Sequence, residues 1–506
     1  MPEYADAYPR GIGHLAGDIP ALRAWARASD IDKSAFAYRE GMIFLGAAAD
    51  GTLLGLDDNR HCLTVAGSRA GKGVSVIVPN LCLYPGSALV IDPKGENAAL
   101  TAARRGMGSS YCEGMGQEVH ILDPFGTVSH YPSASFNPLS VFNLPSKKTA
   151  EWAIDDAALI ANALVTPGGE RDSHWDESAR SVLEMLILHV LTTEAPEART
   201  LPRVRQLLMT GDFLEPMQGN AAFGGLIAGA AGALLALGEQ ERGSILSTAR
   251  RNTKFLDSPA MQEVLVRNDF DLGDLKRCPM TLYLCLPASR LHTHARWLRL
   301  MIGLALALME REPARPALPV LFLMDEFAAL GKMEVIETAT GLMAGYGVKL
   351  WPILQDLTQL KRHYRESWET FLGNAGLHQF FGNTDLTTLE HVSKRLGKTH
   401  VLSVTENENE RAGQGGQGVS VKADTAPLLN PDEVEYFFAR ERQKQIVLIP
   451  GQMPWALRRL SYEDPFFHGK RHWHESLGHD APPTLEQLRN RPDPPKSRGW
   501  GLFGRG

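Results

Sequence analysis

The sequence predicts an α/β fold in which an all-helical segment interrupts a mostly parallel sheet. Short apolar runs alternate with helical patterns from about residue 61 to 122, and again from about residue 281. This alternation is typical of strand–helix–strand units. Between the two regions, from about 149 to 274, apolar residues recur only at helical spacing. With 506 residues, the chain has room for more than one domain.

The chain begins with a lead-in, residues 1–55, in which we expect a short helix at 19–29 and a strand pair at 42–54. The next expected elements are a strand at 61–66, a helix ending near 83, a strand at 88–92, a helix at 97–105 and a strand at 118–122. Charged residues Lys94 and Glu96 follow the second of these strands, where a role as turn and helix cap and a role at the site remain equally open.

The helical segment contains stretches with the apolar spacing of helices at 152–164, 179–191, 202–209 and 245–255. The uncharged stretch 221–238 is nearly long enough to span a bilayer. Because it is mostly Ala and Gly, we interpret it as a buried helix. Strands are then expected at 281–286, 320–324, 348–354, 378–381, 401–404 and 445–449, and the last three are expected to extend the sheet. Helices are expected at 292–309 and 333–345, and a mobile polar loop at 406–418.

The residues from Arg60 to Gly73 have the pattern of a phosphate-binding loop between a strand and a helix. Glycines allow a turn whose successive N–H groups face an anion, and Lys72 adds a charge for the β- and γ-phosphates. The expected nucleotide-binding residues are Gly67, Ser68, Arg69, Ala70, Gly71, Lys72, Gly73 and Val74. Gly73 stands where a Ser or Thr hydroxyl usually holds Mg²⁺, so the source of that ligand remains open.

A second motif lies far downstream, where the apolar run 318–324 ends in Asp325 and Glu326. Such a run is typical of a strand buried on both faces, and the carboxyl end of a parallel strand lies at the ligand edge of a sheet. Asp325 is therefore placed to hold Mg²⁺, and Glu326 to polarise the attacking water. Gln355 ends another buried strand and can orient water or sense the γ-phosphate. These residues predict ATP and Mg²⁺ as cofactors.

The motifs together resemble those of type IV secretion coupling proteins of the TraG/TraD type, ATPases that feed DNA or protein substrates to a secretion channel. The resemblance extends from about residue 60 to about residue 467. The blocks that carry it are Gly71-Lys72-Gly73-Val74, Val90-Ile91-Asp92-Pro93-Lys94-Gly95-Glu96, Phe136-Asn137-Pro138-Leu139, Asp325-Glu326-Phe327 with Leu330-Gly331-Lys332, Gln355-Asp356 with Gln359-Leu360, and Pro431-Asp432-Glu433-Val434.

This resemblance implies a RecA-like P-loop NTPase motor domain at 56–148 and 275–475, with an all-α domain inserted at 149–274. It implies a homohexameric ring, in which each nucleotide site faces a neighbouring subunit. It further implies that Arg60, just before the first motor strand, acts as an arginine finger in the neighbour's site. A second basic position of some relatives is here occupied by Met343, Ala344 and Gly345, so a second finger from that position is doubtful.

The implied activity is ATP-driven delivery of relaxase-bound DNA or of proteins to a type IV secretion channel. Two other functions remain open: an adaptor that binds secreted proteins and uses ATP only as a switch, and a DNA helicase outside any secretion system. The net charge of −6 excludes a surface that is basic all over, but not a basic channel. The sequence does not decide between DNA and protein cargo.

No basic start followed by an apolar core opens the sequence, so we expect no signal peptide. Many members of the family begin with membrane-spanning helices, but we expect no transmembrane segment in this chain. We therefore expect it to be cytoplasmic and peripheral to the bacterial inner membrane. Five cysteines without C-x-x-C spacing indicate reduced thiols. We interpret His468, His472 and His474 as a surface cluster, and the Pro-rich, basic tail at 476–506 as disordered.

Overall fold

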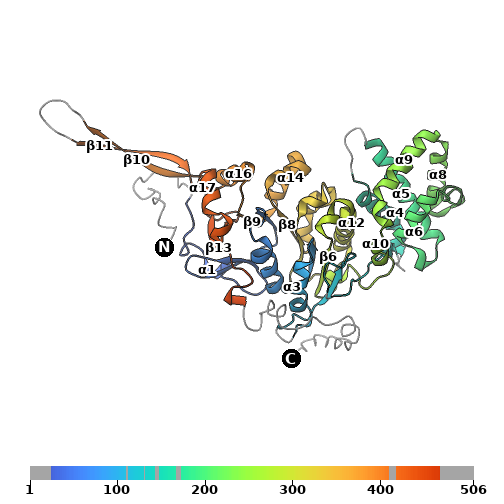
Figure 1. Ribbon diagram of the computed structural model, residues 1–506, viewed down its shortest axis with the longest axis horizontal. Helices are drawn as coiled ribbons and strands as arrows, with labels where there is room; N and C mark the ends of the chain where they lie inside the picture. Colours follow the sequence, from blue (N-terminus) through green and yellow to red (C-terminus); the bar gives the residue numbers. More distant parts are fainter. Residues whose placement is uncertain are drawn as a thin grey trace.

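The protein is described here from a computed structural model (Figure 1). The residues that it describes are 24–109, 112–129, 131–142, 147–166, 173–408 and 417–467. The tail at 476–506 and the cluster of three histidines lie outside these ranges. Residues 24–29 contain no helix, so the helix expected at 19–29 is wrong over its described part.

An eleven-stranded mixed sheet runs through the molecule in the order β2-β1-β13-β12-β9-β3-β8-β7-β4-β6-β5. From β9 to β5 neighbouring strands are parallel, and from β2 to β9 they are antiparallel. The parallel strands are β3 (His61–Ala66), β4 (Ala88–Asp92), β5 (Glu118–Leu122), β6 (Met280–Cys285), β7 (Val320–Met324), β8 (Val348–Leu354) and β9 (Ala375–Phe381). The predicted α/β fold is confirmed.

Strands from the two ends of the described chain form the antiparallel part of the sheet. They are β1 (Ile43–Ala47), β2 (Leu53–Leu56), β12 (Lys444–Leu448) and β13 (Trp455–Arg458). Ala47 of β1 pairs with Arg458 of β13. The strand pair expected at 42–54 therefore forms, and it joins the main sheet.

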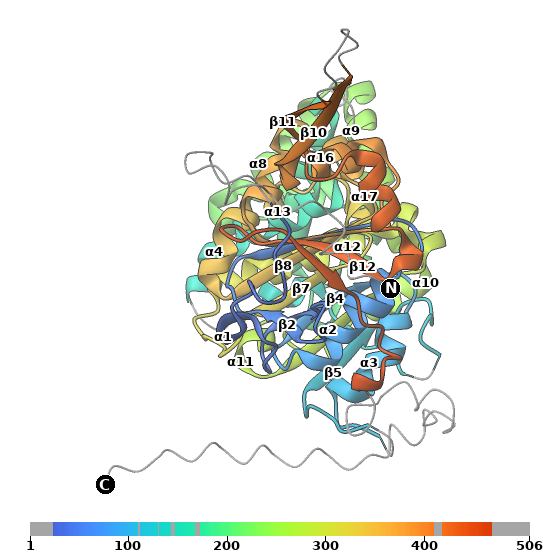
Figure 2. The same ribbon diagram turned by 90° about the vertical axis from the view of Figure 1, so that its left-hand side faces the viewer.

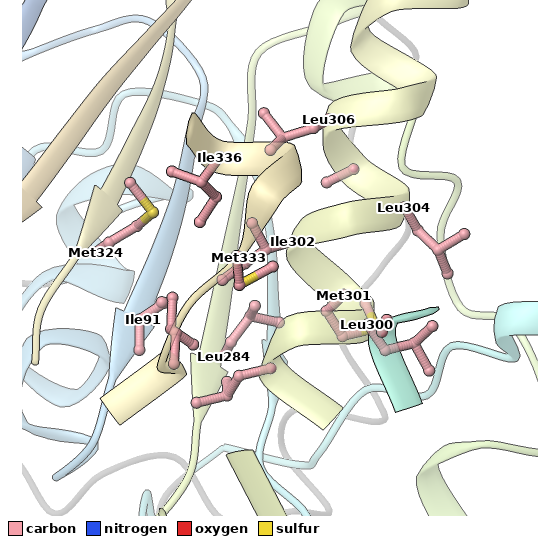
Figure 3. Close-up of a cluster of buried hydrophobic side chains, with 14 of the residues drawn as sticks. Ile91, Leu284, Leu300, Met301, Ile302, Leu304, Leu306, Met324, Met333 and Ile336 are labelled. Carbon is pink, nitrogen blue, oxygen red and sulfur yellow. The ribbon is translucent and has the colours of Figure 1, made fainter. Parts of the chain in front are cut away.

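Helices cover both faces of the sheet. Side chains alternate between the two faces along each central strand, so apolar residues on both faces need helices to cover them. In β4, Leu89 and Ile91 belong to one hydrophobic cluster, and Ala88 and Val90 belong to the other. The helices that pack around the sheet are α2 (Val78–Leu83), α3 (Glu96–Arg105), α12 (Ala288–Arg311), α13 (Glu334–Leu342), α14 (Leu357–Tyr364), α15 (Trp368–Gly373), α16 (Leu386–Leu396) and α17 (Pro431–Phe437). Figure 3 shows residues of α12, including Leu300 and Met301, within one of these buried clusters.

A helical lobe is inserted between β5 and β6, at the right of Figure 1. Its helices are α4 (Lys147–Leu164), α5 (Ser173–Thr193), α6 (Leu201–Thr210), α7 (Leu214–Gln218), α8 (Ala222–Ala236), α9 (Glu239–Asn252), α10 (Pro259–Val264) and α11 (Asp274–Arg277). Helix α5 packs against α4, α8 and α9, and α4 also packs against α12. The predicted helical insertion is confirmed, and the described residues of this segment form no strand.

Helix α8 differs from the buried helix expected at 221–238. Its backbone is non-helical from Phe223 to Gly225, and only Ile227, Ala231 and Leu234 are buried. One side of α8 therefore packs on the lobe, while the rest is at least partly accessible. In the part of the chain that the structure describes, no helix combines the length and apolar character needed to cross a membrane.

Strands β10 (Lys398–Glu408) and β11 (Gln417–Pro427) pair only with each other, as a ribbon that extends away from the body (Figures 1 and 2). The expectation that a strand at 401–404 would extend the main sheet is wrong. Of the expected polar loop at 406–418, residues 406–408 and 417–418 belong to these strands, and residues 409–416 lie outside the described ranges. The apolar residues at 401–404 correctly indicated a strand. They did not show that this strand pairs with β11, the next strand in the chain, instead of with the main sheet.

Candidate nucleotide-binding site

The phosphate-binding loop follows β3, and its path depends on glycine at two positions. A Cβ atom on Gly67 would lie 1.8 Å from the carbonyl oxygen of Gly382, so no larger residue fits without movement of the backbone. Gly71 has a φ of +93°, a conformation that other residues rarely adopt. A π-helix (Gly73–Ile77) then leads into α2, and the hydroxyl of Ser75 donates to the carbonyl of Gly71 at 2.7 Å. The loop thus turns tightly at the edge of the sheet.

Lys72 of this loop contacts both predicted acids. Its Nζ lies 2.9 Å from Oδ1 of Asp325 and 2.6 Å from Oε1 of Glu326. Burial by itself lowers the pKa of Lys72, but the two carboxylates outweigh burial and hold the pKa above its usual value. The three side chains meet because β3 and β7 flank β8 and all three end at the same edge.

The acid pair has an unusual backbone and a close polar neighbour. Glu326 has a φ of +52°, and its N–H donates to Oδ1 of Asp325 at 2.9 Å. Gln355, at the end of β8, donates from Nε2 to Oε2 of Glu326 at 3.0 Å. Burial is the main cause that raises the pKa of Asp325. The structure thus brings Lys72, Asp325, Glu326 and Gln355 together.

Arg60 lies apart from these residues, at the opposite end of β3 from the phosphate-binding loop. Its guanidinium pairs with the carboxylate of Asp58, with 2.5 Å between Nη2 and Oδ2, and 46% of the side chain is exposed. The structure therefore does not place Arg60 in the site of its own subunit. The side chains of Lys94 and Glu96 are both exposed, and Nζ of Lys94 lies 3.7 Å from Oε2 of Glu96.

Arg459 supports the loop from behind, and the sequence analysis missed it. This buried side chain donates from Nη1 to the carbonyl of Ala70 at 2.6 Å and to Oγ of Ser75 at 3.1 Å. Its guanidinium also lies 4.2 Å from the centre of the Phe381 ring. Side chains alternate between buried and exposed along β13, and this alternation places Arg458 outside and the next residue, Arg459, inside. In the sequence alone, however, two adjacent arginines indicate a solvent-exposed segment.

Asp92, the last residue of β4, is another buried carboxyl at this edge. It accepts a hydrogen bond from the N–H of Ala98 at 2.8 Å, and burial raises its pKa to about 7. The nearby Asp325 adds to this rise. Asp92 was noted in the sequence only as part of a shared block, since nothing in the sequence showed how deeply it is buried.

The residues at this edge fit a nucleotide with its Mg²⁺. Among the described residues no cluster of three or more His, Cys, Asp or Glu could hold a metal ion alone. Nucleotide-bound Mg²⁺ needs only one or two carboxylates, because phosphates and water supply the other ligands. Asp325 can supply such a carboxylate beside Lys72. Residue 73 is glycine, so it cannot supply the side-chain hydroxyl that usually binds Mg²⁺ at this position of the loop.

The chain is similar to proteins of one functional group. The family described as "Type IV secretory system Conjugative DNA transfer" matches residues 24–477. The conjugal transfer protein TraG of Escherichia coli is 30% identical over 402 residues, which cover 74% of this chain and 61% of TraG. Protein VirD4 of Rhizobium radiobacter is 27% identical over 464 residues, which cover 87% of this chain and 63% of VirD4. The chain thus spans less than two thirds of these relatives.

Solved structures with the same fold include the bacterial conjugative coupling protein TrwBdeltaN70 in its unbound form. It has a TM-score of 0.64 and 16% sequence identity, and the match covers 89% of this chain and 94% of that one. The plasmid coupling protein TrwB in complex with ADP and Mg²⁺ matches with a TM-score of 0.61 and 16% identity, over 88% of this chain and 96% of that one. At this identity the likeness establishes the fold.

Proposed function

The chain belongs to the type IV secretion coupling proteins of conjugative DNA transfer, and from this premise we propose that it is an ATPase that drives substrates toward a secretion channel. The observation that carries the proposal is the convergence of Lys72, Asp325, Glu326 and Gln355 at one sheet edge. A phosphate-binding lysine, a metal-binding acid and a water-activating acid are the parts that phosphoryl transfer requires.

In the proposed reaction, the loop N–H groups and the Lys72 ammonium bind the β- and γ-phosphates of ATP. Mg²⁺, when bound, neutralises charge on these phosphates, and Asp325 holds it. Glu326 polarises the attacking water, and the Gln355 amide, 3.0 Å from the Glu326 carboxylate, fixes the orientation of that carboxylate. Arg459 keeps the loop in place through its contact with the Ala70 carbonyl.

We propose that the active form is a homohexameric ring and that Arg60 enters the neighbour's site. The partial exposure of Arg60 and its distance along β3 from its own loop support a role in trans. In a closed head-to-tail ring one face of each subunit meets a different face of the next. An arginine there stabilises the charge of the transferred phosphoryl group. As a member of the family, the protein is proposed to act at the cytoplasmic face of the inner membrane with type IV secretion components.

The proposed cargo is relaxase-bound DNA, and the test is ATP turnover with single- or double-stranded DNA across a salt series. A DNA motor is expected to be stimulated by DNA, with the stimulation fading as salt rises, because phosphate contacts release counterions. Turnover indifferent to DNA at low salt would contradict DNA transport. It would favour the second candidate, an adaptor that recruits secreted proteins through the helical lobe and uses ATP as a switch.

Mixing of variants tests the role of Arg60. Arg60→Ala subunits keep Lys72 and Glu326, whereas Glu326→Gln subunits keep Arg60. Mixed rings then contain some complete composite sites, so activity should partly return although each variant alone is nearly inactive. Arg60→Lys should not restore turnover, because Lys lacks the planar fork that binds two oxygens. Inactive mixtures, under conditions where mixed rings form, would show that Arg60 does not act in trans.

A further inference from the structure

A buried lysine lies directly beneath Arg60. Lys349, the second residue of β8, is only 3% exposed. Its Nζ donates to the backbone carbonyl of Arg60 at 2.8 Å and also to the backbone carbonyl of Asp58. The register of the parallel strands explains this position, because Thr64 of β3 pairs with Ile353 of β8. Four positions before each of these residues, Arg60, just ahead of β3, and Lys349 are therefore neighbours.

This position does not require a lysine for packing. The other residues of β8 are apolar, and an apolar residue at 349 would suit a buried strand equally well. Burying an ammonium group is costly unless its donors are satisfied. Lys349 directs those donors to two main-chain oxygens of the turn before β3, so its charge is used to hold that turn.

The same turn is held from its other side by Asp58. One carboxylate oxygen of Asp58 accepts from the backbone N–H of Arg60 at 2.7 Å, and the carboxylate also accepts from Nε of Arg60 at 3.0 Å. The backbone and the guanidinium of Arg60 are thus fixed together: Lys349 holds the carbonyls, and Asp58 holds the N–H and the side chain.

We propose that Lys349 is a positioning residue that fixes the backbone of Arg60, so that the guanidinium reaches the nucleotide of the neighbouring subunit. This inference rests on the proposed role of Arg60 in trans. A long side chain delivers its charge reproducibly only if its main chain is fixed, and a displacement of about 1 Å at a reacting group costs roughly a hundredfold in rate. Lys349 itself touches neither nucleotide nor phosphate in this role.

Strand β8 also gives this arrangement a connection to the subunit's own site. Lys349 lies near the start of β8, and Gln355 follows the end of the same strand. The amide of Gln355 contacts Glu326. Strand β8 therefore carries the support of Arg60 near its start and is followed at its end by a neighbour of the water-activating acid. The turn that carries Arg60 and the sheet edge that holds Lys72 and Glu326 are therefore connected by one strand.

The test is Lys349→Met in the full chain, because methionine has a similar length and donates no hydrogen bond. We expect turnover by the assembled protein to fall about tenfold or more, by the displacement argument above. Nucleotide affinity, measured by equilibrium binding, should stay within about twofold, since the phosphate-binding loop is unchanged. The matched control is Lys394→Met, which removes an exposed lysine of α16 and should leave both quantities unchanged.

Mixing separates positioning from a general structural defect. Lys349→Met subunits keep Lys72 and Glu326, so Glu326→Gln subunits should partly restore their turnover by supplying a well-placed Arg60. The double variant Arg60→Ala/Lys349→Met should turn over no more slowly than Arg60→Ala. If Lys349→Met lowers the melting temperature so far that rings do not form, Lys349→Gln is assayed in the same mixtures. Its side chain is polar but one atom shorter and uncharged, so it loses the charged hydrogen bonds to the two carbonyls and the same results are expected.

Each outcome decides between the inference and its premise. Normal turnover by Lys349→Met, together with slow turnover by Arg60→Ala, overturns the positioning role and leaves the finger in place. Normal turnover by Arg60→Ala overturns the finger and the inference together. A mixture of Lys349→Met and Glu326→Gln subunits that forms rings and gains no activity also overturns the inference, because the defect then lies outside the neighbour's site.

Discussion

The ammonium of Lys72 donates a hydrogen bond to Oε1 of Glu326 at 2.6 Å, although 254 positions separate the two residues in the sequence. Lys72 follows β3 and Glu326 follows β7, and β8 lies between these two strands in the sheet. The two side chains therefore meet beyond the end of β8. Asp325 shares the same ammonium at 2.9 Å. The two acids and the lysine therefore form one charge cluster, and a change in any of them alters the electrostatics of the others.

Lys72→Ala is expected to reduce ATP turnover by at least about a hundredfold, because it removes the charge that neutralises the transferred phosphates. It also leaves the carboxylate of Asp325 without its cationic neighbour. Steady-state ATP hydrolysis measures the loss. The control is Lys394→Ala, an exposed lysine of α16 whose removal should leave turnover unchanged. Near-normal hydrolysis by Lys72→Ala would rule out the assigned site.

Glu326→Gln should bind ATP and fail to hydrolyse it. The amide has nearly the shape of the carboxylate but cannot accept a proton from water. Binding of a fluorescent ATP analogue and single-turnover hydrolysis, measured on the same preparation, separate the two steps. Glu334→Gln removes an exposed carboxylate nearby and should change neither step. Retained hydrolysis by Glu326→Gln would assign water activation to another residue.

Gly73→Ser should fold and should bind Mg²⁺ with ADP more tightly. Apart from its chain neighbours and the backbone of its own helix, no heavy atom lies within 4 Å of the place where a Cβ atom at residue 73 would stand. The serine hydroxyl would supply the ligand common in other phosphate-binding loops. Titration of Mg²⁺ against ADP binding should show a severalfold lower half-saturating concentration. An unchanged Mg²⁺ dependence would mean that the hydroxyl at this position does not reach the metal.

Arg459→Met should weaken nucleotide binding by about tenfold or more, because hydrogen bonds from a charged donor contribute roughly 1.5–3 kcal/mol each. The variant loses the contacts to Ala70 and Ser75 that hold the loop. Equilibrium nucleotide binding is the measurement, with Arg458→Met as the control, since Arg458 lies on the exposed side of β13. Equal behaviour of the two variants would show that the loop does not depend on Arg459.

Acidification should destabilise the protein as pH falls from about 6.5 toward 4. Burial is the main cause that lowers the pKa of His378 to about 4, against a usual 6.5. The unfolded chain then binds a proton that the folded chain excludes, so stability present above pH 6.5 is lost on acidification, by about 3 kcal/mol for this group at the lower limit. His61 and His391 have pKa values of about 4 for the same main reason.

Asp92 acts in the opposite direction over part of this range. Its raised pKa of about 7 favours the folded state at low pH, and that contribution is lost as pH rises from about 4 toward 7. Comparison of His378→Gln with the parent isolates the histidine. The melting temperature of the variant should depend less on pH between 6.5 and 4. Parallel pH profiles would contradict the contribution assigned to His378.

Local patterns in the sequence were sufficient for most of the sheet and for the central residues of the site. Strands β4, β5, β7 and β8 have the predicted limits. Strands β4, β7 and β8 are buried on both faces and are therefore mostly apolar, whereas β5 contains Glu118 and His120. Lys72, Asp325, Glu326 and Gln355 each follow a strand of this kind. Their convergence followed from the parallel topology alone.

The features that were missed depend on contacts between distant segments. A strand in a two-stranded ribbon such as β10 and β11 has the same local sequence pattern as a strand of a large sheet. The sequence therefore could not exclude residues 401–404 from the main sheet. Arg459 and Lys349 are buried cations that bond to backbone carbonyls. Every residue has a backbone carbonyl, so the sequence does not show which carbonyl a buried cation will bind. An acidic partner, which could have been looked for in the sequence, is absent from these contacts.

The support of the phosphate-binding loop by Arg459 has a consequence for biosynthesis. The ribosome makes Ala70 early, but the side chain that holds its carbonyl follows 389 positions later. At about 5–20 residues per second, roughly 20 to 80 seconds pass between the two. A nascent chain therefore carries its loop long before the loop is secured. Full nucleotide affinity is therefore expected only near the end of translation.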